Sequence, residues 1–267
     1  MFPNDIFEFI TTEENRYATE YISLLDNWDW NMKKHLEMCA SMMHSKFLSG
    51  SNDYETNLRP YKNRVRPIIK LRRWSEGIDV KDTELYVDDP DEYGKSFLVK
   101  KYYWDVYIPT YDLDSFYDEA YEEYLTFGGV LVQRIPRKSP EVLPLQAIAF
   151  CDQTDLLGGP IGLKYYFSPA KLKMMAKKGW GDEKYGATLT LDELIRKSEQ
   201  EKEAFQINSG KKIRTTGKSV EVYVVRGELP ESYLRDDGDS EKIVPQLQIV
   251  AFYDTNKDQK AVLYRME

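Results

Sequence analysis

Histidine and cysteine are scarce in this chain of 267 residues, which contains only His35, His44, Cys39 and Cys151. Two cysteines cannot build a disulfide framework or a zinc site of the Cys-x-x-Cys type. A fold held together by disulfide bonds and a zinc-binding fold of this type are therefore both excluded. The two histidines are nine residues apart and would lie on opposite sides of a straight helix, so they cannot share a metal ion. We interpret both as packing or surface residues.

Long apolar runs are also lacking. No stretch approaches the roughly 20 consecutive apolar residues of a membrane-spanning helix. The start, Met1–Asp5, is acidic and lacks the apolar run of a signal peptide. We therefore expect no membrane partner. The cysteines are expected to be free and reduced, which suits the cytosol or a virion, and Cys151 is expected in the core.

The chain has no excess of basic residues. It contains 37 Lys and Arg and 45 Asp and Glu, which gives a net charge of −8. Such a chain is poorly suited to coating nucleic acid over its whole surface. Hydrophobic residues make up 42% and charged residues 31%, which is typical of a soluble globular protein rather than a disordered one.

One segment departs from this balance, since residues 59–73 hold seven basic residues and no acidic one. These candidates for contact with phosphate or with an acidic partner are Arg59, Lys62, Arg64, Arg66, Lys70, Arg72 and Arg73. The same cations can equally form a solvated helix face or pair with acidic residues of this chain. The candidate partner within the chain is the segment 76–124, which holds fifteen acidic residues and four basic ones.

The most suggestive polar cluster is Asp152-Gln153-Thr154-Asp155, which follows an apolar segment. Paired carboxylates at a strand end can bind Mg²⁺, as in nucleases. They can equally organise a turn, because Asp side chains accept hydrogen bonds from nearby backbone. Residues 254–258 begin like a calcium loop, but Gln259 stands where that loop needs glycine. We predict no bound metal and no cofactor.

Aromatic residues are abundant, with 20 tyrosines and five tryptophans. Many gather in the middle third of the chain, at Tyr102, Tyr103, Trp104, Tyr117, Tyr121, Tyr124, Tyr165 and Tyr166. Tyrosine and tryptophan often anchor protein interfaces. A core and rim rich in tyrosine explains the same pattern, and the sequence leaves both interpretations open.

Helices are predicted first along the chain. Thr11 and Glu14 form a capping-box pattern that predicts a helix start, and Asp29 is a candidate cap for a second helix. A third helix is expected from about Pro60 to Trp74, kinked or divided at Pro67. Further helices are expected over 96–106, followed by a loop through Pro109, and over 112–127, with Gly128 and Gly129 as the stop.

Strands dominate the later part, over 130–135, 142–144, 147–151, 161–167 and 219–226, with a hairpin formed by 247–253 and 261–265. A helix after Ser168-Pro169 interrupts them, because serine caps a helix and proline suits its first turn. No alternating βαβ series appears, so the predicted class is α+β. We divide the chain into an N-terminal helical region, 1–78, and an α+β domain with mainly antiparallel strands, 79–267.

The order of segments resembles the portal (head–tail connector) proteins of tailed double-stranded DNA phages. The segments that carry the resemblance are Asn63–Ile69 leading to Trp74–Val80, Asp112–Phe127 passing through Gly128-Gly129 into Val130–Val132, Pro140–Asp152 followed by Gly159–Gly162 and Ser168-Pro169, and Val220–Gly227 with Leu247–Tyr253. On this resemblance the domain over 79–267 corresponds to the portal wing.

The resemblance implies a structural virion protein, assembled in the host cytoplasm, with no enzymatic activity. Portal proteins form a ring, usually of twelve subunits, at one capsid vertex. Double-stranded DNA passes through the ring, and capsid, terminase and tail-adaptor proteins bind it. Family members continue through stem helices, a clip and a crown, so we interpret this chain as a fragment, a partial gene or a short divergent form.

Two other functions remain as alternatives. One is a magnesium-dependent nuclease or phosphotransfer enzyme that uses Asp152 and Asp155. The other is an interaction module that binds one heterologous partner through its tyrosine-rich middle third. Metal binding that depends on Asp152 and Asp155 tests the first alternative. Binding of one heterologous partner without self-assembly distinguishes the second from the portal-like hypothesis.

Overall fold

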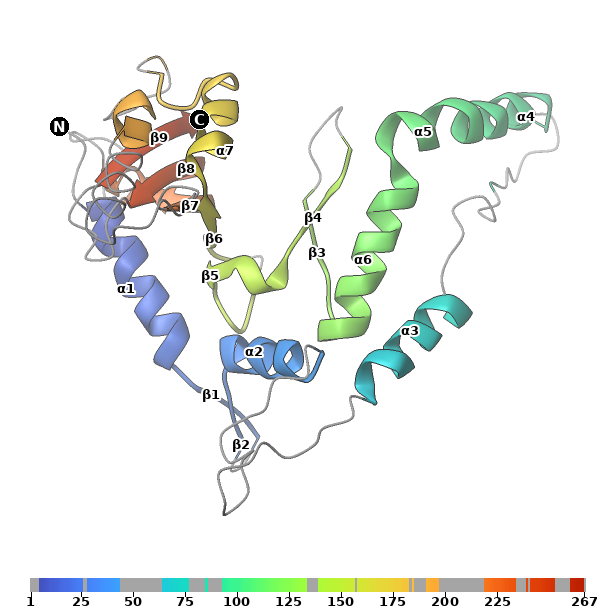
Figure 1. Cartoon of the computed structure of the whole chain (residues 1–267), viewed down its shortest axis with the longest axis horizontal. Coiled ribbons are helices and arrows are strands. Elements are labelled where there is room, and N and C mark those ends of the chain that lie inside the picture. The colour runs from blue at the N-terminus through green and yellow to red at the C-terminus, as the bar shows by residue number, and fades with distance from the viewer. Residues whose placement is uncertain are drawn as a thin grey trace, which may run out of the picture. The chain divides into compact units, whose positions relative to one another are not determined.

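The computed structural model describes residues 5–25, 28–43, 64–76, 85, 93–133, 139–156, 158–182, 184, 191–196, 219–233, 239, 241–252 and 260–266. The fold is α+β, as predicted, with helices first and antiparallel strands later (Figure 1). The chain divides into one unit of Met1–Met32 with Ala147–Glu267 and another of Lys33–Gln146. The predicted boundary between residues 78 and 79 lies outside the described residues and stays a prediction.

The first unit is built on a five-stranded antiparallel sheet. Its strands follow the chain order, each pairing with the next: β5 (Ile148–Phe150), β6 (Ile161–Phe167), β7 (Val220–Pro230), β8 (Ile243–Phe252) and β9 (Lys260–Met266). The predicted strand over 161–167 and the predicted pairing of the last two strands are confirmed. Residues 254–257, predicted as the turn of that hairpin, lie outside the described residues.

The middle strand of this sheet, β7, is apolar on both faces over much of its length. Val222, Tyr223, Val224 and Val225 are consecutive and all buried. A strand with one solvated face alternates between polar and apolar residues, whereas a strand covered on both faces is apolar throughout. β7 therefore lies at the centre of the hydrophobic core of this unit.

Helix α1 (Asp5–Thr19) starts six residues earlier than the predicted capping box. Thr11 lies inside the helix and its Oγ1 donates to the carbonyl of Phe7 at 2.9 Å, so the capping-box prediction was wrong. Burial explains the longer helix, because Ile6, Phe7 and Ile10 precede or flank Thr11 and are all buried. Their packing stabilises helical turns that lack a local start signal.

A short hairpin, β1 (Ile22–Leu25) and β2 (Trp28–Trp30), follows α1. Asp29 lies within β2, so it does not cap the next helix. Asn31 is the buried polar residue at this point, and its Nδ2 donates to the carbonyls of Tyr17 (3.0 Å) and Glu20 (2.6 Å). Asn31 thus ties the end of α1 to the start of α2 (Met32–Met43).

A charged network joins α1 to the sheet. Lys164 Nζ on β6 lies 2.8 Å from Glu14 Oε1 and 3.4 Å from Glu221 Oε2, and the Tyr223 hydroxyl donates to Glu14 Oε2 at 2.7 Å. Burial alone lowers the pKa of Lys164, but the hydrogen bonds and charges of Glu14 and Tyr223 outweigh it and raise that pKa. Burial is also the main reason that the pKa of Tyr223 is raised.

Replacement of Glu14 is expected to destabilise the first unit. Glu14→Gln removes the charge opposite Lys164, and we expect the free energy of unfolding in urea to fall by about 2–3 kcal/mol. Glu20→Gln is the matched control, because that exposed carboxylate lies 3.7 Å from Arg16 and contributes less than about 0.5 kcal/mol. Equal losses for the two variants would contradict a special role for Glu14.

Gly162 allows β5 and β6 to pair closely. It faces Phe150 across the two strands, and a Cβ at this position would clash with the Phe150 ring. Phe150 is only 1% exposed, so the surrounding core holds the ring in place. The structure therefore requires glycine here for lack of space.

Gly162→Ala is expected to lower the free energy of unfolding by about 1–3 kcal/mol, because the added methyl group overpacks the core. Gly129→Ala is the control, since a Cβ at Gly129 meets no atom within 4 Å. Thermal and urea unfolding of both variants measure the difference. A Gly162→Ala protein as stable as the Gly129→Ala protein would contradict this account.

The second unit consists of helices and one short hairpin. Helix α3 (Val65–Glu76) precedes α4 (Tyr93–Tyr102), a π-helical turn η3 (Tyr103–Tyr107), α5 (Ile108–Tyr111) and α6 (Leu113–Phe127). Strands β3 (Leu131–Gln133) and β4 (Glu141–Leu143) pair in antiparallel fashion, and the 3₁₀ turn η4 (Leu145–Ala147) follows. None of the described helices is long and apolar enough to cross a bilayer.

Pro67 was predicted to kink or divide a helix and Pro109 to lie in a loop, but both lie in the first turn of a described helix. Pro67 lies in the first turn of α3, where its missing N–H removes no hydrogen bond, so the predicted kink is wrong. Pro109 lies at the start of α5 rather than in a loop. The wider turn of η3 immediately before it relieves the clash that a proline ring makes inside a regular α-helix.

Asp112 sets the bend between α5 and α6. It has a left-handed backbone (φ 46°), the one positive φ at a residue other than glycine in the described part of the chain. Aspartate tolerates this conformation better than most residues. It occupies the predicted cap position, but its carboxylate accepts a hydrogen bond from the Ser115 hydroxyl (2.9 Å) rather than from the backbone. Gly128, with φ 80°, ends α6 as predicted.

Candidate functional site

The predicted basic segment forms helix α3 in its described part. Arg59 and Lys62 lie outside the described residues. Arg64 directly precedes the helix and is exposed, and Arg66, Lys70, Arg72 and Arg73 lie on it. Helical spacing places Arg66, Lys70 and Arg73 on one side, since these residues are three or four positions apart. Arg72 lies away from that side.

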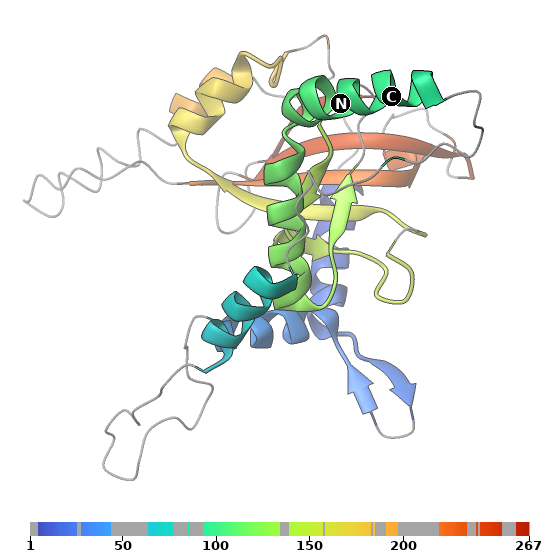
Figure 2. The same ribbon diagram turned by 90° about the vertical axis from the view of Figure 1, so that its right-hand side faces the viewer.

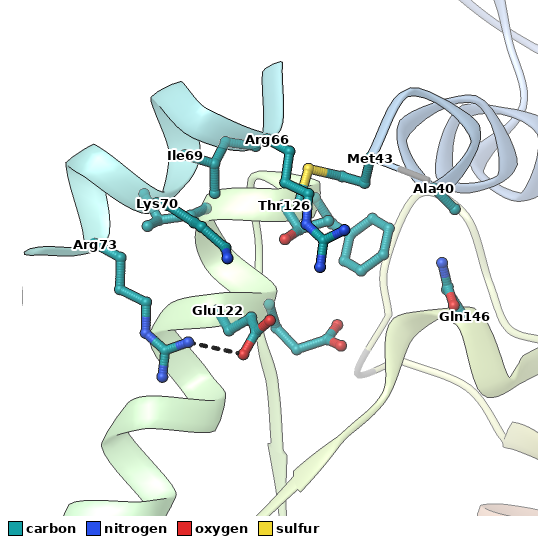
Figure 3. Close-up of a pocket in the computed structure, with 12 residues that line it drawn as sticks. Ala40, Met43, Arg66, Ile69, Lys70, Arg73, Glu122, Thr126 and Gln146 are labelled. Carbon is teal, nitrogen blue, oxygen red and sulfur yellow. Dashed lines mark hydrogen bonds and ion pairs between the residues drawn. The ribbon is translucent and has the colours of Figure 1, made fainter. Parts of the chain in front are cut away.

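Arg73 pairs with the acidic helix α6. Its Nη1 lies 3.0 Å from Glu122 Oε2 (Figure 3). Its Nη2 lies 3.5 Å from Asp118 Oδ1. The acidic block of the sequence therefore supplies the partner of at least this cation. For Arg73, pairing within the chain is the interpretation that the structure bears out.

A cavity of about 270 Å³ lies between α2, α3 and α6. Figure 3 shows Arg66 and Lys70 extending from α3 toward it, with Glu122 on the opposite side. Glu123 also lines the cavity. Carboxylates beside the cations offset the positive charge that would attract phosphate. Phosphate contact by the remaining cations of the basic segment stays a prediction.

Glu123 is half-buried at the base of α6. Its Oε2 accepts a hydrogen bond from the backbone N–H of Leu145 at 3.3 Å, which ties α6 to the turn after β4. Burial raises the pKa of this carboxyl group, the hydrogen bond from Leu145 partly counteracts the rise, and the neighbouring charge of Glu122 adds to it. The folded protein therefore binds this proton more tightly than the unfolded chain does.

This raised pKa predicts a pH effect on stability. The contribution of Glu123 to the free energy of unfolding is greatest below the ordinary carboxyl pKa and falls as pH rises through the raised value. Glu123→Gln removes the titration but keeps an oxygen that can accept from Leu145. We expect the variant to lose this downward slope and to gain stability relative to wild type as pH rises.

Urea unfolding at a series of pH values measures the slope. Glu119→Gln, which neutralises an exposed carboxylate on the same helix, controls for the loss of one negative charge. If Glu123→Gln and wild type show the same slope across the acidic range, the burial of Glu123 has no such effect.

The predicted carboxylate pair at 152 and 155 organises a turn. Asp152 Oδ1 accepts hydrogen bonds from Thr154 N (2.7 Å), Thr154 Oγ1 (2.6 Å) and Asp155 N (3.2 Å). The hydrogen bonds from Thr154 and Asp155 lower the pKa of Asp152. Gln153 between them accepts from the N–H of Met32 at 2.9 Å. No group of three His, Cys, Asp or Glu side chains in the described ranges is placed to hold a metal ion.

The two cysteines are not activated. Cys151 is buried, as predicted, and burial raises its pKa to about 12. Cys39 Sγ lies 3.7 Å from His35 Nε2 on α2, but burial raises the pKa of this thiol as well. A raised pKa disfavours the thiolate, which is the nucleophilic form. His44 lies outside the described residues.

The tyrosines serve both of the roles left open by the sequence. Tyr103 and Tyr111 are partly buried against Ile108 and Leu113, which form a small core. Tyr102, Tyr117 and Tyr124 are exposed. Tyr165 and Tyr166 belong to β6 of the other unit, so the tyrosine-rich stretch of sequence is divided between the two units.

Exposed apolar side chains on α3 and α4 are the feature that sequence reasoning missed. Trp74 is 86% exposed, and Ile68 and Leu71 lie on the same side of α3, away from the cations that face the cavity. On α4 no residue is buried. The apolar residues of a short helix are normally expected to be buried in the core. Whether they are buried depends on contacts with residues distant in the sequence, so the sequence alone does not show their exposure.

No protein-family model matches this chain, and no curated protein matches it at a significant level.

Proposed function

We propose that this chain is a structural subunit similar to a phage portal protein. It assembles with copies of itself into a ring at the capsid vertex, through which double-stranded DNA passes, and it contacts capsid, terminase and tail-adaptor proteins. It is assembled in the host cytoplasm, resides in the virion and has no catalytic activity of its own. The order of helices and strands that resembles portal proteins supports this proposal.

The exposed apolar surface of α4 carries the proposal. Phe97 and Leu98 are each 65% exposed, and Tyr93, Val99 and Tyr102 are also more than half exposed. Isolated helices of this length are unstable in water and depend on packing of their apolar side chains. Exposed apolar patches of this kind mark surfaces that other proteins cover. A subunit of a ring buries such a surface against its neighbour.

The uneven charge of the second unit supports assembly through the same region. Helix α4 contains three lysines and no carboxylate, whereas α6 contains five carboxylates and no basic residue. Opposite charges on separate surfaces of one subunit favour contacts between subunits and disfavour wrong orientations. The nuclease alternative lacks a supporting observation of this kind, because the Asp152 carboxylate accepts hydrogen bonds from Thr154 and Asp155 within its own turn.

The mass of the full chain in solution tests the proposal. We expect native mass spectrometry and light scattering to show an oligomer at micromolar concentration. Phe97→Glu is expected to raise the dissociation constant at least about tenfold, because it places a charge in the buried contact.

Met174→Glu is the matched control for this experiment, since Met174 is 63% exposed but lies on α7 (Pro169–Ala176) of the other unit. We expect it to assemble like wild type. A wild-type chain that stays monomeric at all concentrations contradicts the proposal. A monomer that binds one heterologous protein would instead support the interaction-module alternative.

A further inference from the structure

One face of α4 combines aromatic and cationic side chains. Tyr93, Phe97, Lys100 and Lys101 follow one another at intervals of four, three and one residues, so they share one side of the helix. Tyr93 is 62% exposed, and Lys101 is exposed as well. The stripe therefore presents two aromatic rings beside two ammonium groups.

The outward face of α6 has the complementary composition. Asp114 and Asp118 are four residues apart, and Tyr117, Tyr121 and Tyr124 follow one another at intervals of four and three, so these side chains share one side of the helix. Tyr117, Tyr121 and Tyr124 line a cavity of about 190 Å³ together with Asp118 and with Arg73, which pairs with Asp118. Carboxylates and tyrosine rings are the groups that attract ammonium ions, the rings through their negatively polarised faces. We call this surface the tyrosine face.

Helix α4 does not reach the tyrosine face of its own chain. Helices α4, η3 and α5 continue one another, and Asp112 then turns the chain into α6. Phe97 lies fifteen residues before Asp112, a distance of about 22 Å along a helix. Both views show α4 leading away from α6 beyond that bend (Figure 2). The two complementary surfaces of one chain thus remain apart.

We propose that the cationic aromatic stripe of α4 in one copy of this chain docks on the tyrosine face of α6 in the next copy. This inference rests on the proposed self-assembly and names the surfaces that form it. Lys101 lies against Asp114, and the rings of Tyr93 and Phe97 pack on the tyrosines.

A second copy is the favoured occupant because both halves of the contact are present on one subunit. The contact joins two different surfaces, so each subunit offers a stripe to one neighbour and a tyrosine face to the other. Such head-to-tail contacts generate a closed ring when the rotation between subunits divides the circle evenly. The contact also requires opposite charges, so added salt weakens it.

Charge reversal on either surface tests the pairing in the full chain. The stripe variant carries Lys101→Glu and the face variant carries Asp114→Lys, since Asp118 already pairs with Arg73 of its own chain. Either variant on its own places like charges opposite one another in the contact. We therefore expect the dissociation constant for self-assembly of that variant to rise at least about tenfold. Lys95→Glu and Glu119→Lys are the matched controls, because each lies on the opposite side of the same helix, and both are expected to assemble like wild type.

Mixing the two variants gives the decisive result. The reversed stripe fits the reversed face, and the unchanged stripe of the face variant fits the unchanged face of the stripe variant. We therefore expect a one-to-one mixture to recover assembly, with equal numbers of the two chains in native mass spectra. Circular dichroism checks that each variant folds, and Lys101→Asp or Asp114→Arg replaces a variant that does not.

The outcomes separate this inference from the proposed function. Wild-type assembly with loss in both variants and recovery in the mixture supports the docking. Wild-type assembly with no loss in either variant, or with no recovery on mixing, overturns the docking and leaves self-assembly intact. A wild-type monomer overturns the proposed function, and the docking with it. A monomer that binds a different protein through α4 also overturns both.

Discussion

The contact of Glu14 with Lys164 and Tyr223 is the interaction on which the first unit depends. It joins residues that are 150 and 209 positions apart, because the Glu14 carboxylate accepts hydrogen bonds from the Lys164 ammonium group and the Tyr223 hydroxyl group. The chain leaves this unit after Met32 and returns at Ala147. Closing so long a loop costs chain entropy, and the buried charges help to fix where α1 packs on the sheet.

The two units differ in how completely they bury their apolar residues. In the first unit, β7 is covered on both faces and α1 is held by charges and by its own apolar side. In the second unit, α4 has no buried residue, and α3 directs Ile68, Leu71 and Trp74 outward. The first unit buries its apolar side chains in its own core, whereas the second leaves those of α3 and α4 exposed. We propose that a neighbouring subunit covers them.

Much of the fold was predictable from short segments. The helix from 113 to 127 with its glycine stop, the Ser168 cap that accepts from Lys171 N, and the strand over 161–167 each depend on signals within a few residues. The capping box at Thr11 failed because burial of Ile6, Phe7 and Ile10 extended α1 past it. Of the candidate site, the basic residues were predicted, but the direction in which each one points was not.

The sequence by itself determined the local elements, the concentration of positive charge on α3 and the excess of negative charge on α6. These follow from residue type and from spacing within a few helical turns. The tertiary structure alone decided that Arg73 meets Asp118 and Glu122, that Asp152 holds a turn, and that α4 is exposed. Ion pairs between distant residues and the burial of apolar side chains form only when distant parts of the chain pack together.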